Sequence, residues 1–490
     1  MSTHPPPSVS DLQRDFQDMI ALVTGERAYT MTADTVEREL LSRLLALGAK
    51  LLHLFFATRA ALRPTAPVLA SDGSELPYHS EKPASYFSIF GKIRFERPYF
   101  YKPGYPGVSP LDAELSLPER CYSDLLCECA ECLAVDRPFE SGLEVLKRLL
   151  RLILPKLALE TAVKEDTADV LDYYEQKMPP VPATEGNILV AQADGKGVPM
   201  VNNEPATAKA RLGKGEKHVH KKEAIATSLY TIVPYVRSPV DVVAALFHPE
   251  KASDAQLQRP KPANKQVLAT LAGKEVAITR LAEQAARRQG DHITDHVALT
   301  DGSEPLQLQV TSKLTGFTLV LDVIHASEYL WKAANVLLGE TNPQRDIWVE
   351  ARALALLSGD APGVIQLLEE TAKEQKLTDV QQGILGQVSG YLQRNLLYMH
   401  YDEYLARGWP IGTGVVEGTC RHLVKDRMEL SGMRWVKEGA QAVLDLRAVY
   451  ENDDWDDYQR FRRERRHTRL YKTPFPDQPV SEFTCLELAA

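Results

Sequence analysis

The chain has 490 residues, which corresponds to roughly two to four domains, and its 44% hydrophobic and 25% charged residues are ordinary for a globular protein. Its formal net charge of −9 does not indicate nucleic-acid binding, so only local basic patches could support that function. No uninterrupted apolar run reaches the ~18 residues of a membrane span, and no signal-peptide pattern opens the chain. We therefore expect a cytoplasmic protein with no membrane partner.

Residues 1–75 are predicted to form an N-terminal helical region. From about Val9 to Arg63, apolar residues recur at intervals of three and four, which is the period of an amphipathic helix. Such a face is a packing surface, either within the protein or against another copy, and the sequence leaves both alternatives open. The residues that would form it are Leu40, Leu41, Leu44, Leu45, Leu47 and Leu51.

Residues 76–178 are predicted to contain a β-hairpin followed by helices, and they are the candidate DNA-binding region. Aromatic and β-branched residues alternate with basic ones around Phe90-Gly91-Lys92, which is typical of a hairpin. Its basic residues could contact a phosphate backbone, or they could form an ordinary solvated face. The helices on either side of 136–140 could form a helix-turn-helix reader of DNA or plain bundle packing.

A cluster of cysteines lies within the first of these helices. Zinc sites usually use pairs of cysteines two residues apart, separated by a loop. Here the intervals are six, two and three residues within one predicted helix, so small core residues are the default interpretation and no zinc is expected. The cysteines are Cys121, Cys127, Cys129 and Cys132.

Three short apolar runs between residues 184 and 325 each end in an aspartate. The first run leads to Asp194, the second to Asp301 and the third to Asp322, which is followed by His325. Short apolar runs bounded by turn residues predict buried strands, and their spacing predicts an α/β domain with helices between the strands. Residues 264–290 are expected to form one of these helices.

The chain then becomes helical and later basic. Residues 326–408 lack strand signals and are predicted to be an all-helical block. In 409–450, a Gly-Thr-Gly turn leads into a helix whose first turn carries Glu417, with Arg421 and Lys425 on the same helical face. Residues 451–490 are expected to be an exposed basic tail.

Asp194, Asp301 and Glu417 are candidate ligands for catalytic metal ions. Phosphoryl transfer on DNA needs cations that activate the attacking oxygen and offset charge on the leaving oxygen. Mg²⁺ prefers carboxylate oxygens. Carboxylates from different elements that converge at one sheet edge would suit a two-metal site, although an Asp-rich strand edge is also common without one.

Together with their order and spacing, eight short motifs resemble those of a bacterial insertion-sequence transposase of the ISKra type, a DDE transposase of the RNase H-like superfamily. The resemblance runs from about Phe90 to Tyr458. The motifs are Phe90–Arg97, Pro110–Ala113, Ala193–Gly197, Tyr235–Arg237, Thr300–Gly302, Leu321–Glu328, Gly412–Gly418 and Ser431–Trp435.

The resemblance implies an RNase H-like core, from 184–325 and 409–450, interrupted by the helical insertion at 326–408. It implies that Asp194, Asp301 and Glu417 are catalytic and hold two Mg²⁺ ions, with Mn²⁺ as a substitute. Asp322 and His325 would orient the metal ligands from behind or position the DNA, with core packing and helix capping as the alternative. Relatives often carry cysteine pairs around the hairpin; this chain has none there, so zinc is not expected.

The implied activity is cleavage of terminal inverted repeats and strand transfer to target DNA. The partners would be DNA and a second or further copy of the chain, and the location would be the bacterial cytoplasm at the nucleoid. The alternative is a catalytically inactive DNA-binding or assembly protein on the same fold. Candidate DNA-binding residues are Lys209, Arg211, Lys214, Lys217, Lys221, Lys222, Arg421, Lys425, Arg427, Arg434 and Trp435.

Overall fold

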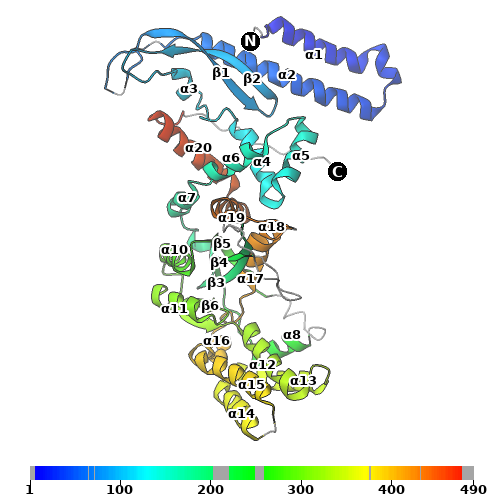
Figure 1. The fold of residues 1–490 in the computed structure, drawn as a ribbon, viewed down its shortest axis with the longest axis vertical. Coiled ribbons are helices and arrows are strands. Elements are labelled where there is room, and N and C mark those ends of the chain that lie inside the picture. Colours follow the sequence, from blue (N-terminus) through cyan, green and yellow to red (C-terminus); the bar gives the residue numbers. More distant parts are fainter. Residues whose placement is uncertain are drawn as a thin grey trace, which may run out of the picture. The chain divides into compact units, whose positions relative to one another are not determined.

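The computed structural model describes residues 6–64, 66–70, 72–201, 220–248, 259–374, 377–430 and 432–476. These fall into two compact units, which we describe separately. The first lies within Met1–Asp169 and Asp456–Ala490, and the second is Val170–Trp455 (Figure 1). The predicted DNA-binding residues Lys209, Arg211, Lys214 and Lys217 lie outside the described residues.

The first unit begins with an antiparallel pair of helices, which confirms the predicted helical character of this region. Helix α1 (Val9–Thr24) and helix α2 (Ala33–Ala61) are joined through a short 3₁₀ turn. The side chains of Ser8 and Thr32 accept hydrogen bonds from backbone N–H groups in the first turns, so both helices begin at capping residues.

The predicted hairpin is also confirmed. Strand β1 (Tyr78–Ser88) pairs antiparallel with β2 (Gly91–Phe100), and the turn lies at Phe90, as expected. The alternating inward residues of β2 pack on α2, where the ring of Phe56 stacks on that of Phe95 with centroids 4.4 Å apart. Lys92 and Arg94 on the same strand are not buried.

The basic segment near the C-terminus is helical, and its arginines are largely paired. Helix α20 (Trp455–Tyr471) packs in the first unit with α4 (Asp124–Asp136), α5 (Phe139–Leu150) and α6 (Lys156–Asp166). The Arg462 guanidinium is 2% exposed and lies 2.8 Å from a carboxylate oxygen of Asp166. The expectation of an exposed tail is therefore only partly right for this helix: Arg462 is buried because acidic residues over 290 positions earlier in the chain meet it, whereas Arg465 and Arg469 are exposed. Further pairs are Arg463–Glu128, Arg466–Asp124 and Arg469–Asp169.

Helix α2 is an exception to the prediction that no segment of the chain is long and apolar enough to span a membrane. By length and composition, Ala33–Ala61 is apolar enough to cross a membrane, and very little of it is buried in the described structure. The sequence criterion missed it because charged residues such as Lys50 and Arg59 interrupt the apolar run. Its second half packs on the β-hairpin, so the helix is partly covered by protein.

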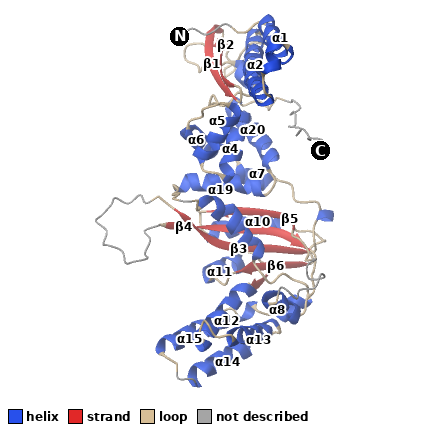
Figure 2. Cartoon of the chain, turned by 90° about the vertical axis from the view of Figure 1, so that its right-hand side faces the viewer, coloured by secondary structure: helices blue, strands red, loops and turns tan. Residues whose placement is uncertain are grey.

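The second unit is built on a mixed five-stranded sheet in the order β5-β4-β3-β6-β7 (Figure 2). Strand β3 pairs antiparallel with β4 and parallel with β6, and β7 continues the parallel side. This mixed α/β arrangement is compatible with the RNase H-like fold that the resemblance implies. The strands are β3 (Ile188–Pro199), β4 (Lys221–Ile232), β5 (Ala263–Thr270), β6 (Asp295–Thr300) and β7 (Thr318–Leu321).

Alternate residues of β3 enter two separate cores, one on each face of the sheet. Leu189, Ala191 and Ala193 pack with α10 (Lys274–Arg287) and α11 (Glu304–Lys313). Ile188 and Val190 pack on the other face with α12 and the helices that follow it. Those helices are α12 (Val323–Leu338), α13 (Gln344–Leu357), α14 (Ala361–Glu374), α15 (Asp379–Arg394) and α16 (Tyr401–Ala406).

The remaining elements of this unit are helical. Helix α7 (Val170–Gln176) opens the unit and α8 (Pro239–Phe247) follows β4. A continuous helical segment is formed by α17 (Gly414–Thr419), a π-helical turn (Cys420–Lys425) and α18 (Asp426–Met428), and α19 (Lys437–Glu451) packs beside β5.

The prediction of one helix over 264–290 is partly wrong. Residues 263–270 form strand β5, and the helix begins only after Gly273, whose φ of +102° ends the strand segment. Val267, Leu268 and Ala269 are buried beside β4 and α19. Pairing with a strand about 40 residues earlier decides the conformation here, and a local helical pattern cannot register that pairing.

Candidate active site

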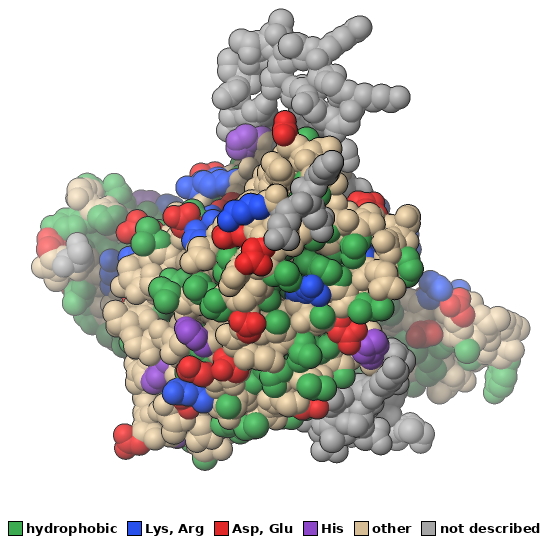
Figure 3. All heavy atoms as spheres, turned by 90° about the horizontal axis from the view of Figure 1, so that it is seen from below, with side chains coloured by type: hydrophobic (Ala, Val, Ile, Leu, Met, Phe, Trp, Pro, Cys, Tyr) green, Lys and Arg blue, Asp and Glu red, His purple; other side chains and the backbone are tan. Residues whose placement is uncertain are grey.

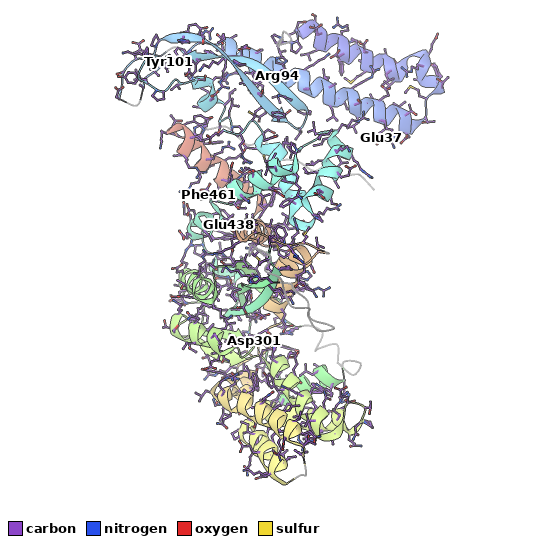
Figure 4. The ribbon with its side chains drawn as sticks, in the orientation of Figure 1. Glu37, Arg94, Tyr101, Asp301, Glu438 and Phe461 are labelled. Carbon is purple, nitrogen blue, oxygen red and sulfur yellow. The ribbon has the colours of Figure 1, made fainter. Side chains whose placement is uncertain are left out.

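Three aspartates lie at matching positions on three adjacent parallel strands. Asp301 and Asp322 directly follow β6 and β7, but β3 continues through Asp194 to Pro199 because it stays paired with β4, so the predicted turn after Asp194 is wrong. Gln192 of β3 pairs with Leu299 of β6, so two residues further Asp194 lies opposite Asp301. Thr300 pairs with Leu321 of β7, which brings Asp322 to the same level. The sheet thus delivers three carboxylates to one edge, and Figure 4 labels Asp301 there, between the strands and the helical block.

Asp322 is buried and caps helix α12. Its Oδ2 accepts hydrogen bonds from the backbone N–H of His325, at 3.0 Å, and from Nδ1 of the same residue, at 2.6 Å. That side-chain hydrogen bond is the main cause that raises the pKa of His325 to about 9, with burial opposing it. The ring is therefore a cation at neutral pH, and Asp322 fixes its orientation.

Glu417 reaches this edge through a loop that is tied to the sheet. Oδ1 of Asp322 accepts a hydrogen bond from the backbone N–H of Thr413, at 3.0 Å, and Oγ1 of Thr413 donates to Glu417 at 2.9 Å. The buried Gln192 holds the same loop: its Oε1 accepts from the N–H of Val416, at 2.9 Å, and its Nε2 donates to the Tyr230 hydroxyl, at 3.0 Å, and to the Gly412 carbonyl, at 3.3 Å.

Ligand atoms of Asp322, His325 and Glu417 all lie within 4.8 Å of one another. These three residues come from two segments more than 90 positions apart, which the Thr413 hydrogen bonds connect. The donor set is rich in carboxylate oxygens, which suits a hard cation such as Mg²⁺. Nδ1 of His325 is engaged by Asp322, and the carboxylate oxygens are the donors that suit a hard cation here.

Asp194 shares this electrostatic environment. Burial raises its pKa; the backbone N–H of Gly195 opposes that effect, and the neighbouring Asp301 adds to it. The Cys420 thiol donates a hydrogen bond to Asp194, and the positive charge of His325 acts on it as well. Asp301 in turn contributes to the raised pKa of His325. Like-charged carboxylates gathered in this way favour a bound cation.

The backbone around Asp301 is held by the helical block. The Tyr391 hydroxyl donates to the Asp301 carbonyl, at 3.0 Å, and the N–H of Ser303 donates to Oδ1 of Asp301, at 2.9 Å. Gly302 has φ +87°, and a Cβ there would meet the Tyr391 hydroxyl oxygen at 2.5 Å. Glycine is therefore required for this turn.

The candidate DNA-binding residues after Glu417 divide by burial. Arg421, Lys425 and Arg434 are exposed. Arg427 is fully buried and stacks on the ring of Trp435, whose Nε1 donates to the Met428 carbonyl at 3.1 Å. Those two side chains hold the end of α18 in place and do not face solvent. The π-helical turn between them and Glu417 is of a kind that is frequent at functional sites.

Lys221 and Lys222 begin strand β4, two residues after the part of the chain that the structure leaves undescribed. Nζ of Lys221 pairs with Glu429 at 2.5 Å. On the face drawn in Figure 3, acidic, basic and apolar side chains are interspersed.

A cavity of about 980 Å³ borders the loop that carries Glu417. Gly412, Gly414 and Val323 form one wall; among the residues that the structure describes, none of the four site carboxylates is part of the lining. Arg237 lines another wall; burial lowers its pKa to about 10, one of its amino groups donates to the Trp409 carbonyl, and its Nε has no hydrogen-bond partner among the described residues. Further lining residues are Tyr230, Tyr235, Arg259 and Lys261.

Gln192 and Thr413 are site residues that the sequence prediction missed. Gln192 is the single amide within the apolar run that ends at Asp194, and a buried amide must find partners. The presence of one amide in an otherwise apolar strand could therefore have identified Gln192 from the sequence. Thr413 lies in the quoted Gly-Thr-Gly turn, but its contacts with Asp322 and Glu417 depend on tertiary structure.

Comparison with known proteins assigns this chain to no family. No family model matches the chain, and no curated protein matches it. Among solved structures, it is similar to one described as the Drosophila P element transposase strand transfer complex, with a TM-score of 0.25 and 9% identity, over 74% of this chain and 86% of that chain. A likeness at this TM-score determines neither fold nor function, so the conclusions below depend on the geometry of the site.

Proposed function

We propose that this protein is a DNA transposase of the DDE type, which cleaves DNA at the ends of its element and joins them to target DNA with the help of Mg²⁺. The observation that carries the proposal is the register of Asp194, Asp301 and Asp322 across three parallel strands, with Glu417 brought to the same edge by a tethered loop. An acidic edge of this kind suits phosphoryl transfer on nucleic acids.

Asp194, Asp301 and Glu417 would hold the metal ions. Two bound Mg²⁺ ions would supply Lewis acidity that activates the attacking water or 3′-hydroxyl and offsets charge on the leaving oxygen. Asp322 has both carboxylate oxygens occupied by His325 and Thr413, so its role is to position those residues and, through Thr413, Glu417. The orienting role agrees with the one that the family resemblance implies.

The DNA would be held by basic residues around this edge. Arg421 and Lys425 follow Glu417 on the same helical segment and are exposed, so they are suited to phosphate contacts. The cavity beside Gly412 has room for a nucleotide, and Arg237, Arg259 and Lys261 offer it cationic groups. Transposition handles two DNA ends, so the working species would be a homodimer or a higher oligomer in the bacterial cytoplasm.

The test is cleavage of a supercoiled plasmid that carries the coding sequence with its flanking DNA. With Mg²⁺ or Mn²⁺, the wild-type protein should nick this plasmid. Asp194→Asn, Asp301→Asn and Glu417→Gln should each reduce the rate by at least ~100-fold, since each removes a negative charge needed to hold a cation. Gel-shift binding to the same DNA should persist in all three variants.

Asp295→Asn is the matched control. Asp295 begins strand β6, at the opposite end from Asp301, and accepts a hydrogen bond only from its neighbour Thr294 among the described contacts. This variant should nick DNA at the wild-type rate. If Asp194→Asn cuts normally, the metal-site assignment is refuted. If the wild-type protein binds DNA but never cuts it, the second candidate gains: a catalytically inactive DNA-binding or assembly protein on the same fold.

A further inference from the structure

Helix α1 carries an exposed apolar stripe that its partner helix does not cover. Its buried residues Leu12, Met19 and Leu22 face α2. On an adjacent face, four apolar side chains are 39–60% exposed and recur at the alternating three- and four-residue intervals of a coiled-coil seam, with the position of Gln13 completing the repeat. These side chains are Val9, Phe16, Ile20 and Val23.

Helix α2 carries a second stripe with the same spacing. Four apolar side chains, each 43–55% exposed, follow the heptad from position 41 to position 55, and Gly48 fills the position between them. Glu37, labelled in Figure 4, lies one turn before the first of them and marks the polar end of the stripe. The side chains are Leu41, Leu44, Leu51 and Phe55.

Both stripes lie on the same side of the helix pair. Nζ of Lys50 meets Asp15 and the Arg43 guanidinium meets the Asp18 carbonyl, which fixes an antiparallel register. Each helix has one face that meets the other helix and one face that carries its stripe. At about 100° per residue, the stripe face lies roughly 90° around the helix axis from the contact face, in the direction in which residue numbers increase. Because the two helices are antiparallel, a turn of roughly 90° of this kind on each helix brings both stripes to the same side of the pair. Ile20 then lies level with Leu44, and Val23 with Leu41.

The opposite side of the pair is polar or small. On α1 it carries Asp11, Arg14 and Gln17, and on α2 it carries Ser42 and Ala46. The pair is therefore amphipathic as a whole. Its apolar face is covered at Gly48 by the ring of Phe90, itself partly exposed, and the side chains on either side of that contact remain about half exposed. Monomeric proteins rarely expose a contiguous apolar patch of more than a few hundred Å².

We propose that this face of α1 and α2 packs against the same face of a second copy, so that the two helix pairs form a four-helix bundle. Eight large apolar side chains, each about half exposed, offer on the order of 700 Å² per copy, close to the ~800 Å² that each partner buries in a standard interface. Heptad spacing on both helices is the pattern of helix-on-helix packing, and a two-fold axis makes the surface complementary to itself.

A lipid bilayer is the other surface that apolar helices meet, and the contacts of α2 argue against it. Its second half is covered by the β-hairpin through Phe56, and its middle is joined to α1 by the Lys50–Asp15 ion pair. Spanning a membrane would require breaking that pair or burying it in hydrocarbon, at a cost of several kcal/mol. The exposed stripe alone is apolar, and it has the geometry of a helix interface.

The test is the mass of the full-length chain in solution, measured by size-exclusion chromatography with light scattering at micromolar concentration. The wild-type protein should have twice the 54.6 kDa of one chain. Leu44→Glu combined with Leu51→Glu, and separately Ile20→Glu, should give the monomer mass, because each places charge in the bundle core. Circular dichroism should show unchanged helix content, since neither α1–α2 contacts nor the hairpin is altered.

Ala46→Glu is the control, because it adds the same charge to α2 on the polar side, and it should remain dimeric. A monomeric wild-type chain, or a dimer that survives both stripe variants, would overturn the proposal. Flotation with liposomes of neutral and anionic phospholipids is the companion measurement. Wild-type binding that the stripe variants abolish, together with a monomer mass, would assign the face to lipid instead. The proposal does not depend on the proposed DNA cleavage, so failure of either leaves the other standing.

Discussion

Replacing Gln192 by leucine should loosen the link between the sheet and the loop that carries Glu417. Gln192 is 1% exposed and makes three hydrogen bonds, to Tyr230, Gly412 and Val416. Leucine has a similar size but no polar atom, so the N–H of Val416 and the carbonyl of Gly412 would be left buried without these partners. At ~1–3 kcal/mol for each of these two unsatisfied groups, the free energy of unfolding should fall by roughly 2–6 kcal/mol.

Tryptophan fluorescence during urea denaturation is a suitable assay. Four of the five tryptophans, at positions 331, 348, 409 and 435, lie within the second unit, and Trp455 stands at the boundary where α20 begins, so the signal reports mainly on the unit that contains the site. Thr227→Val is the matched control: it removes a buried hydroxyl from the same sheet, but that hydroxyl makes one weak hydrogen bond of 3.5 Å, to Leu268. Its cost should stay below ~1 kcal/mol.

The variant also has a functional readout. If Gln192 holds the loop, the rate of plasmid nicking should fall by ~10-fold or more in Gln192→Leu and remain normal in Thr227→Val. The nicking assay is run under conditions in which the denaturation curve shows both variants to be folded. Should Gln192→Leu match Thr227→Val in both stability and nicking rate, the claim that this side chain positions Glu417 is refuted.

Two further predictions concern buried charges. Burial raises the pKa of Asp445 to about 7, with Gln441 and Arg280 opposing it, so the stabilising contribution of its neutral form is present below pH ~4 and lost as pH rises towards 7. The free energy of unfolding of Asp445→Asn, measured by the fluorescence assay, should therefore rise by roughly 2–4 kcal/mol relative to that of the wild type between pH 4 and 8. A difference between the two proteins that stays constant with pH would contradict this. Arg462→Met should destabilise the first unit by up to roughly 3–5 kcal/mol, because Asp166 loses one of its two arginine partners among the described residues and keeps only Arg120. Calorimetry should show a lower melting transition for the first unit, and an unaltered calorimetric profile would count against the ion-pair network.

Local signals in the sequence were sufficient for the elements that the site needs. The alternation around Phe90 predicted the hairpin, and apolar runs ending in Asp194, Asp301 and Asp322 predicted β3, β6 and β7. Each of these signals is short-range, since a buried apolar strand is visible within about ten residues. The end of β3 was predicted wrongly at Asp194, because pairing with β4 carries the strand on to Pro199. The parallel register that aligns the three aspartates follows from the strand order, which the spacing suggested only as an α/β domain.

Partners distant in the chain account for what the sequence did not reveal. Residues 263–270 have a helix-like pattern, but they pair with β4. The arginines of α20 form a basic run in the sequence, yet Asp124 and Asp166 neutralise Arg462 and Arg466 in the fold. In both cases the deciding contact joins residues tens to hundreds of positions apart, and one sequence gives no direct sign of it.

The negative charge of the candidate site opposes the approach of DNA that the proposed activity requires. Asp194, Asp301, Asp322 and Glu417 gather four carboxylates, while His325 is the cation that Asp322 already holds. A DNA phosphate approaching this edge meets net negative charge, and the chain as a whole has a charge of −9. The exposed Arg421 and Lys425 lie on the Glu417 segment but do not outnumber the carboxylates. Close approach of DNA to the site therefore requires bound cations, so tight binding at this edge and metal loading should rise together, while binding through other basic surfaces should not depend on the metal.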